Sequence, residues 1–278
     1  MTIPKLPLGE AIEAAIDFLT ENFSFITKAV SNVVENANEV LVENLEKIPP
    51  MVLILLIALL AWRLAGRRIA LFSVAGLALI WNLGLWGATM ATISLVIAAT
   101  LVAISLGIPI GIASALFPLV NRIVLPILDL MQTMPAFVYL IPAIPFFGLG
   151  PVSAVFSTVI FAMPPAIRLT DLGIRQVPKE LIEAADAFGS SRLQKLLKVQ
   201  LPLARPTIMA GVNQTIMLSL SMVVIAAMIG AGGLGSEVWK AIQRFKPGMG
   251  FEAGLAVVII AIIFDRITQK ITHQGKTH

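Results

Sequence analysis

The stretch Glu183–Pro202, EAADAFGSSRLQKLLKVQLP, is a charged, helix-forming segment in the middle of an otherwise apolar chain. Gly189 can adopt the left-handed conformation that ends a helix, and either of the two serines that follow can cap a second helix. Pro202 is expected to stop that second helix. The pattern predicts two short helices joined by a sharp turn, with Phe188 as an apolar side chain at the tip.

The composition of the whole chain is typical of an integral membrane protein. Of its 278 residues, 58% are hydrophobic and only 13% are charged, whereas a soluble domain carries about 25% charged residues. The chain has no cysteine and two histidines, both in its last six residues, so we expect neither a disulfide nor a metal site. Basic residues do not alternate with aromatic ones, which argues against nucleic acid as a partner.

Seven apolar segments have a length and composition suited to membrane helices. We therefore predict an all-α integral membrane protein with about seven transmembrane helices. The predicted spans are 50–63, 69–86, 88–117, 127–147, 151–168, 207–230 and 251–268.

The first 48 residues differ from these spans because their apolar residues recur at helical spacing and are interleaved with charges. Three lysines stand against eight carboxylates. Such a pattern predicts an acidic, amphipathic helical segment that lies at the membrane interface. We predict an extracytoplasmic scaffold segment over 1–48, a transmembrane domain over 49–272 with a cytoplasmic loop at about 169–206, and a polar tail over 273–278.

The distribution of basic residues predicts the orientation. With seven spans, Arg63, Arg67 and Arg68 fall on the same side as the many basic residues of the 169–206 loop and of the C-terminal end. Because lysine and arginine accumulate in cytoplasmic loops, this side is cytoplasmic and the N-terminal segment lies outside.

Helix-breaking and polar residues concentrate in consecutive predicted spans. The prolines are expected to interrupt the fourth and fifth spans, and an asparagine opens the sixth. Broken membrane helices commonly line a transport pathway, although proline is also more frequent in membrane helices in general. The candidate pathway and hinge residues are Pro135, Pro142, Pro145, Pro164, Pro165 and Asn213.

The opening stretch also fits a known motif. The motif begins with Glu-Ala-Ala, and a Gly follows after three residues. After nine further residues come a branched apolar residue, one residue of any kind and Leu-Pro. The segment resembles the cytoplasmic loop of permease subunits of bacterial binding-protein-dependent ABC importers of type I. Within that family, residues 66–272 are most similar to permeases for glycine betaine, proline betaine and choline, as in PILDLMQTMPAFVYLIPAIPFFG, FAMPPAIRLTDLGIRQVP and SMVVIAAMIGAGGLG. The motif positions are Glu183, Ala184, Ala185, Gly189, Val199, Leu201 and Pro202.

The resemblance implies that this segment is a coupling helix, which inserts into an ATP-binding subunit. It implies a second permease copy, two ATP-binding subunits that use ATP and magnesium, an extracytoplasmic binding protein and a place in the bacterial inner membrane. The chain itself would then be a transport subunit rather than an enzyme. The residues assigned to coupling are Glu183, Ala184, Ala185, Phe188, Gly189, Leu201 and Pro202.

Three alternatives remain open. The cargo could be another small solute such as an amino acid. The chain could be a secondary transporter or channel that works alone, which would leave the charged hairpin without a purpose. It could also be a membrane scaffold or an enzyme, but the sequence contains neither a phosphate-binding GxxxxGK loop nor a convergent acid, base and nucleophile set.

Overall fold

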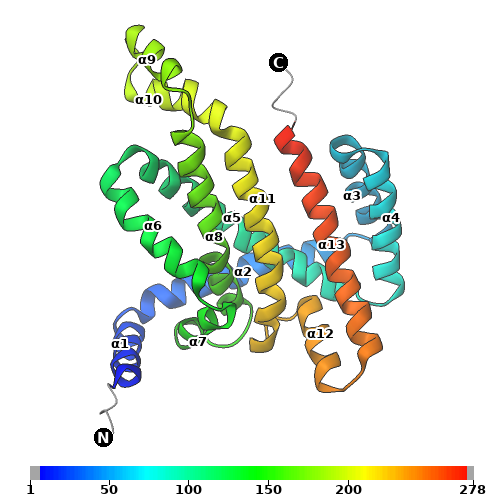
Figure 1. Cartoon of the computed structure of the whole chain (residues 1–278). Helices are drawn as coiled ribbons and strands as arrows, with labels where there is room; N and C mark the ends of the chain where they lie inside the picture. The colour runs from blue at the N-terminus through cyan, green and yellow to red at the C-terminus, as the bar shows by residue number, and fades with distance from the viewer. Residues whose placement is uncertain (1–6, 274–278) are drawn as a thin grey trace, which may run out of the picture.

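A computed structural model describes residues 7–273, and all regular elements in this range are helical. Figure 1 shows an elongated helical bundle with a small hairpin at one end and α1 at the other. Residues 274–278 of the predicted polar tail lie outside the described residues. The elements are α1 (Leu8–Asn22), α2 (Ser24–Lys47), α3 (Pro50–Ala65), α4 (Arg67–Asn82), α5 (Trp86–Leu116), α6 (Pro118–Thr133), the 3-10 turn η1 (Ala136–Tyr139), α7 (Leu140–Phe147), α8 (Pro151–Arg175), α9 (Lys179–Ala187), α10 (Arg192–Lys195), the π-helical turn η2 (Leu196–Gln200), α11 (Leu201–Ala226), the 3-10 turn η3 (Ala227–Ile229), α12 (Gly233–Gln243) and α13 (Pro247–His273).

The helical membrane fold is confirmed, but the number of seven spans is not. Within residues 7–273, four helices are long and apolar enough to cross a membrane individually, namely α5, α8, the continuous helix 192–229 and α13. Counting the bent pairs α2–α3 and α6–α7 as one span each gives up to six. The helices α3 and α4 have 16 residues each, which is shorter than the roughly 20 residues that span a bilayer core.

The predicted span 127–147 is wrong as a single helix. The helices α6 and α7 are bent by 114° relative to each other. The bend falls at Met134, whose backbone is extended, and Pro135, which precedes η1. A proline disfavours the helical conformation of the residue before it, so the chain turns here.

The prediction that Pro164 and Pro165 break the fifth span is also wrong, because α8 continues from Pro151 to Arg175. Both prolines are buried, and protein neighbours can shield the backbone groups that a proline leaves unpaired in a membrane helix. Since α8 ends only at Arg175 and α11 begins at Leu201, the loop between these two helices is shorter than the predicted 169–206.

Pro202 does not stop the second hairpin helix, contrary to expectation. The chain stays helical from Arg192 to Ile229. The backbone N–H of Leu201 donates to the carbonyl oxygen of Leu196, five residues earlier, which is the spacing of a π-helical turn. Because proline lacks an N–H and crowds the preceding turn of an α-helix, this wider turn just before Pro202 accommodates it.

The core of the bundle is the contact of α8 with α5 on one side and α11 on the other. Glycines stand where the backbones meet. A Cβ atom on Gly111 of α5 would lie 2.6 Å from the carbonyl oxygen of Ile167, and one on Gly211 of α11 would lie 2.9 Å from that of Pro165. Small residues thus allow the close helix packing that membrane proteins use.

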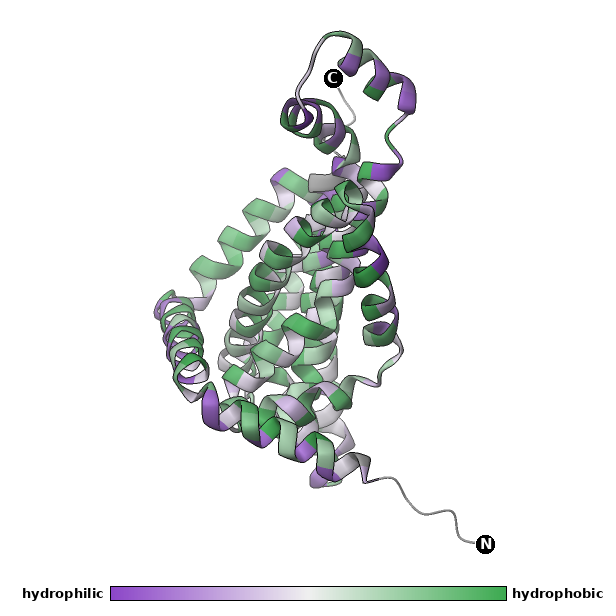
Figure 2. Ribbon diagram, turned by 90° about the vertical axis from the view of Figure 1, so that its left-hand side faces the viewer, coloured by the Kyte–Doolittle hydropathy of each residue, from purple (hydrophilic) through white to green (hydrophobic). Residues whose placement is uncertain are grey.

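The N-terminal segment forms two amphipathic helices rather than a span. The helix α2 is bent by 101° from α3 and contacts α5, α7 and α8. Asn38 is buried in this contact, where its side-chain oxygen accepts a hydrogen bond from Ser94 at 2.9 Å. Hydrophobic residues dominate the central helices, whereas hydrophilic residues are frequent in the N-terminal helices and the hairpin (Figure 2).

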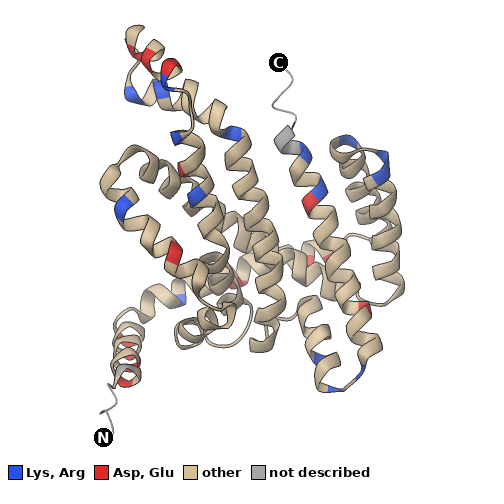
Figure 3. Ribbon diagram, viewed as in Figure 1, with Lys and Arg blue, Asp and Glu red and all other residues tan. Residues whose placement is uncertain are grey.

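The two ends of the bundle differ in charge. The connection between α3 and α4 carries basic residues and lies at the end where the hairpin projects, as does the C-terminal part of α13 (Figure 3). Acidic residues mark α1 at the opposite end, although the turn between α12 and α13 adds basic residues there.

Candidate functional site

The segment that follows α8 folds as the α9–α10 hairpin (residues 178–200), which projects from one end of the bundle (Figure 1). Gly189 ends α9 with a φ of 73°. The N–H of Gly189 donates to the carbonyl oxygen of Asp186 at 2.9 Å, and that of Ser190 donates to Ala185 at 3.0 Å. This pair of bonds is a Schellman motif, so the left-handed conformation at Gly189 fixes the turn.

Side chains then hold the two limbs of the hairpin together. Ser191 caps α10 through a reciprocal pair of hydrogen bonds with Gln194, a capping box. The Lys195 ammonium contacts the Asp186 carboxylate at 2.6 Å. The turn at Gly189 is therefore closed by contacts local in sequence.

The outer surface of the hairpin has few contacts within this chain. The Phe188 side chain is 90% exposed at the tip, and Leu193 is 63% exposed. Glu183 and Ala184 are exposed as well, and Ala185 is partly buried. An aromatic side chain at the tip of a projecting hairpin can insert into an apolar pocket of a protein partner.

The base of the hairpin is anchored to the bundle through a small apolar cluster. Leu196 is buried against Ile174 of α8 and Ala204 of α11, and Leu201 packs against the same cluster. Pro202 is exposed beside it. Leu201 and Pro202 therefore lie at the start of α11, away from the Phe188 tip, and connect the hairpin to a membrane helix.

A recess of about 540 Å³ separates the hairpin from the connection between α5 and α6. The hairpin is thus joined to the bundle mainly at its base. The recess is lined by Ala115, Leu116, Phe117, Ile182, Arg192, Leu193, Lys195, Leu196 and Gln200.

The predicted pathway prolines do not form one cluster. Pro135 precedes η1 at the α6–α7 bend, and Pro142 and Pro145 lie in α7, at the end of the bundle opposite the hairpin (Figure 1). Pro164 and Pro165 are buried in the middle of α8. The prolines therefore occupy two levels of the bundle.

Asn213 joins two membrane helices. Its Nδ2 donates to Asp265 of α13 at 3.0 Å, and its Oδ1 accepts a hydrogen bond from Thr268. Asp265 also accepts from Gln269 at 2.7 Å. Asn213 thus connects α11 to α13 in this conformation.

Two charged pairs of α8 were not predicted from the sequence, one that connects α8 to α6 and one within α8 itself. Arg168 contacts Asp129 of α6 at 2.6 Å, and Arg175 contacts Asp171 at 2.9 Å. The signal was present, because charged residues inside an apolar helix are rare and usually paired. The spacing of four residues between Asp171 and Arg175 also places both on one helix face.

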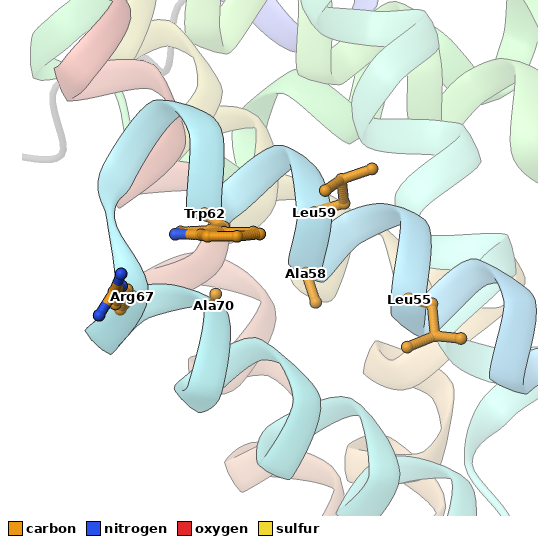
Figure 4. Close-up of a pocket in the computed structure, with 6 residues that line it drawn as sticks. All are labelled: Leu55, Ala58, Leu59, Trp62, Arg67 and Ala70. Carbon is orange, nitrogen blue, oxygen red and sulfur yellow. The ribbon is translucent and has the colours of Figure 1, made fainter.

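A second recess, about 360 Å³ in volume, lies between α3 and α4 (Figure 4). Its only charged lining residue is Arg67, and the others are apolar. Because it lies on helices that carry none of the candidate residues, we assign it no part in transport. The lining residues are Leu55, Ala58, Leu59, Trp62, Arg67 and Ala70.

These features define a class of protein, a helical membrane protein with an exposed hairpin at one end of its bundle. The family model for the binding-protein-dependent transport system inner membrane component matches residues 107–272. The chain belongs to this family of ABC importer permeases. Members are multi-pass inner-membrane subunits that work with a separate ATPase, so the chain is a transport subunit and not an enzyme.

Two relatives match almost the whole chain. It is 52% identical over 275 residues to the glycine betaine transport system permease protein OpuAB of Bacillus subtilis, covering 99% of this chain and 98% of the relative. It is 49% identical to the glycine betaine/carnitine transport permease protein GbuB of Listeria monocytogenes, covering 99% of both chains.

Solved structures support the same fold. A chain of the MetNI methionine ABC transporter in an inward-facing conformation superposes with a TM-score of 0.63 and 20% sequence identity, covering 67% of this chain and 94% of the other. At this identity the likeness bears on the fold alone. The predicted family is confirmed by the family model and the two relatives.

Proposed function

We propose that this chain is the permease subunit of an ATP-driven importer for glycine betaine and related quaternary ammonium osmoprotectants. The observation that carries the proposal is the end-to-end similarity to OpuAB, at 52% identity over 99% of this chain. The complex would contain two permease copies, two ATP-binding subunits that hydrolyse magnesium-bound ATP, and an extracytoplasmic binding protein that delivers the solute.

In this proposal the α9–α10 hairpin is the contact with the ATP-binding subunit. Phe188 would fill an apolar pocket of that subunit, since the side chain is 90% exposed at the hairpin tip. Glu183 would make polar contacts, and Ala184 and Ala185 would permit close approach. Movement of the ATP-binding subunits would then reach the membrane helices through the base of the hairpin, where Leu201 and Pro202 begin α11.

The bends and buried prolines would serve the change between inward- and outward-facing states. Pro135, at the 114° bend between α6 and α7, is the clearest hinge candidate. Pro142 and Pro145 in α7 and Pro164 and Pro165 in α8 would let these helices adjust without losing further backbone hydrogen bonds. Asn213 would exchange its contact with α13 during the cycle.

The N-terminal segment 1–48 would be an extracytoplasmic scaffold. The helix α2 packs on the bundle through Asn38, whereas Phe25 and Val33 are 83% and 68% exposed. On an acidic helix, such an exposed apolar face would favour the membrane interface through burial of apolar area rather than through attraction to anionic lipids. The N-terminus would then be outside and the C-terminus cytoplasmic, as the basic residues at the hairpin end suggest.

Uptake of labelled glycine betaine tests the proposal. The chain would be co-expressed with candidate ATP-binding and binding-protein subunits from the same organism, purified as a complex and reconstituted in liposomes that contain ATP. We expect ATP-dependent uptake that other quaternary ammonium compounds compete. A complex that assembles and imports an amino acid instead would reject the cargo, and transport by the chain without any ATPase would reject the mechanism.

A further inference from the structure

Four polar residues near the hairpin end of the bundle bond to one another across three helices. The Asp171 carboxylate on α8 accepts from Arg175 Nε at 2.9 Å and from Asn121 Nδ2 of α6 at 3.3 Å. Asn121 also donates to the Ser114 hydroxyl of α5 at 3.0 Å, and Arg175 donates to the Ser114 carbonyl oxygen at 2.7 Å. We call this set, Ser114, Asn121, Asp171 and Arg175, the polar joint.

Burial makes this arrangement costly to disturb. Asp171 is 7% exposed and Ser114 is fully buried, so the carboxylate depends on these partners in place of water. Removing one partner of a buried charged group leaves the other without compensation. Ionisable residues within membrane segments are uncommon and are generally functional.

The polar joint lies between two connections of the chain. On one side, Arg175 ends α8, and only Gln176, Val177 and Pro178 separate it from α9. Ile174 beside it packs against Leu196 of the other hairpin limb. Both limbs of the hairpin therefore meet α8 next to the polar joint.

On the other side, Ser114 and Asn121 flank the connection between α5 and α6 at Phe117. One turn before Ser114, the α5 backbone at Gly111 lies so close to α8 that a Cβ would be 2.6 Å from the Ile167 carbonyl oxygen. The end of α5 and the end of α8 are therefore held both by close backbone packing and by the polar joint.

We propose that the polar joint makes α8 and the α5–α6 connection move as one body when the ATP-binding subunit moves the hairpin, with Asp171 as the central positioning residue. The proposal rests on the proposed importer function but not on the identity of its cargo. Without the polar joint, a displacement of the hairpin would be transmitted to α8 and α11 but not to α6.

A distance measurement on α6 tests this directly. The chain has no cysteine, so Leu119→Cys, at an α6 position that is 70% exposed, takes a single spin label in each of the two permease copies. The distance between the labels is measured in the complete complex, first without nucleotide and then after ATP hydrolysis in the presence of vanadate, which traps ADP and vanadate in the ATP-binding subunits. We expect an ATP-dependent change in the parent and less than half of that change with Asp171→Asn.

The Asp171→Asn variant should also hydrolyse more ATP for each solute molecule that it imports. Replacing the carboxylate by an amide weakens the hydrogen bonds that it accepts from Arg175 and Asn121, so we expect the ATP hydrolysed per solute imported to rise by about tenfold. A residue that only stabilised the fold would lower the amount of complex and its thermal midpoint and leave this ratio unchanged.

Asp129→Asn is the matched control. Asp129 and Arg168 also connect α6 to α8, at 2.6 Å, but their side chains are 67% and 38% exposed. Unlike Asp171, Asp129 is not buried within the chain, so its replacement leaves no buried charge unpaired. Both the label distances and the ATP hydrolysed per solute imported should therefore equal those of the parent. If Asp171→Asn fails to assemble, Asn121→Ala replaces it, because this change removes the α6 member of the polar joint and keeps the Asp171–Arg175 pair.

The outcomes separate this inference from the proposed function. A full ATP-dependent distance change in both Asp171→Asn and Asn121→Ala would contradict the proposed role of the polar joint. So would a parent complex in which the label on α6 does not move at all. Glycine betaine uptake by the same parent complex, measured in parallel, decides the cargo independently of either result.

Discussion

The α9–α10 hairpin and the packed helices α5, α8 and α11 are held in shape by different kinds of contact. The hairpin depends on neighbours in sequence: the Schellman turn at Gly189, the capping box of Ser191 and the ion pair of Lys195 with Asp186. The three helices depend on contacts between residues far apart in sequence, because Gly111 and Gly211 allow the backbone of α8 to approach closely.

This difference separates two tasks. A hairpin with an exposed tip and a locally fixed turn can dock onto a partner without altering the bundle. Helices in close backbone contact transmit a displacement rather than absorb it, because a packed interior is not easily deformed. Substitutions in the two regions should therefore affect different measurements.

The largest effect is expected in the packed helices. Gly111→Val places a branched side chain where even a Cβ would lie 2.6 Å from the Ile167 carbonyl oxygen and the Thr170 side chain. We expect a loss of about 3 kcal/mol or more in stability, measured as the loss of monodisperse permease after extraction in detergent. Gly254→Val in α13 is the control, because nothing lies within 4 Å of its Cβ, and it should leave the yield near that of the parent.

A smaller effect, confined to assembly, is expected at the hairpin tip. Phe188→Ala removes a side chain that is 90% exposed, so the isolated permease should keep its thermal midpoint. Loss of an aromatic anchor costs about 2 kcal/mol, or about 30-fold in affinity for the ATP-binding subunit, which a binding titration in detergent would measure. Phe245→Ala is the control, since Phe245 is 92% exposed in the turn between α12 and α13. Equal affinities for the two variants would contradict the assigned docking surface.

These two regions also differ in how far the sequence predicts them. The turn at Gly189 and the cap at Ser191 were predictable because each depends on residues within a few positions. The bend at Pro135 and the uninterrupted helix through Pro164 and Pro165 were not distinguishable in the sequence. A proline ends or bends a helix only if its neighbours in space leave the freed backbone groups unshielded.

The candidate site shows the same limit. The hairpin residues follow from a motif of fixed spacing, whereas the hydrogen bond of Asn213 to Asp265 joins residues 52 positions apart. The pairing of Asp171 with Asn121 likewise depends on how α6 packs on α8. Only the Asp171–Arg175 spacing of four residues could have drawn attention to this position from the sequence.

The hairpin turn gives a sharper test of coupling than its tip. Gly189 has a φ of 73°, a conformation that costs a branched residue about 1–2 kcal/mol. With Gly189→Val we expect uptake to fall about tenfold while the amount of permease in the membrane stays constant. Asparagine adopts the left-handed conformation more readily than valine does, so the Gly189→Asn variant should retain uptake. If Gly189→Val transports like the parent, the turn geometry has no role in coupling.

The smallest effect is expected where the N-terminal segment meets the bundle. Ser94→Ala leaves the buried Asn38 side-chain oxygen, now bonded at 2.9 Å, without this donor. Hydrogen bonds between membrane-protein helices contribute about 0.6 kcal/mol on average, so we expect the thermal midpoint to fall by about 2 °C with uptake unchanged. Ser221→Ala is the matched control, since that hydroxyl donates to the carbonyl oxygen of Met217 in its own helix. A loss of uptake with Ser94→Ala, at an unchanged thermal midpoint, would mean that α2 takes part in the transport cycle rather than supporting the bundle.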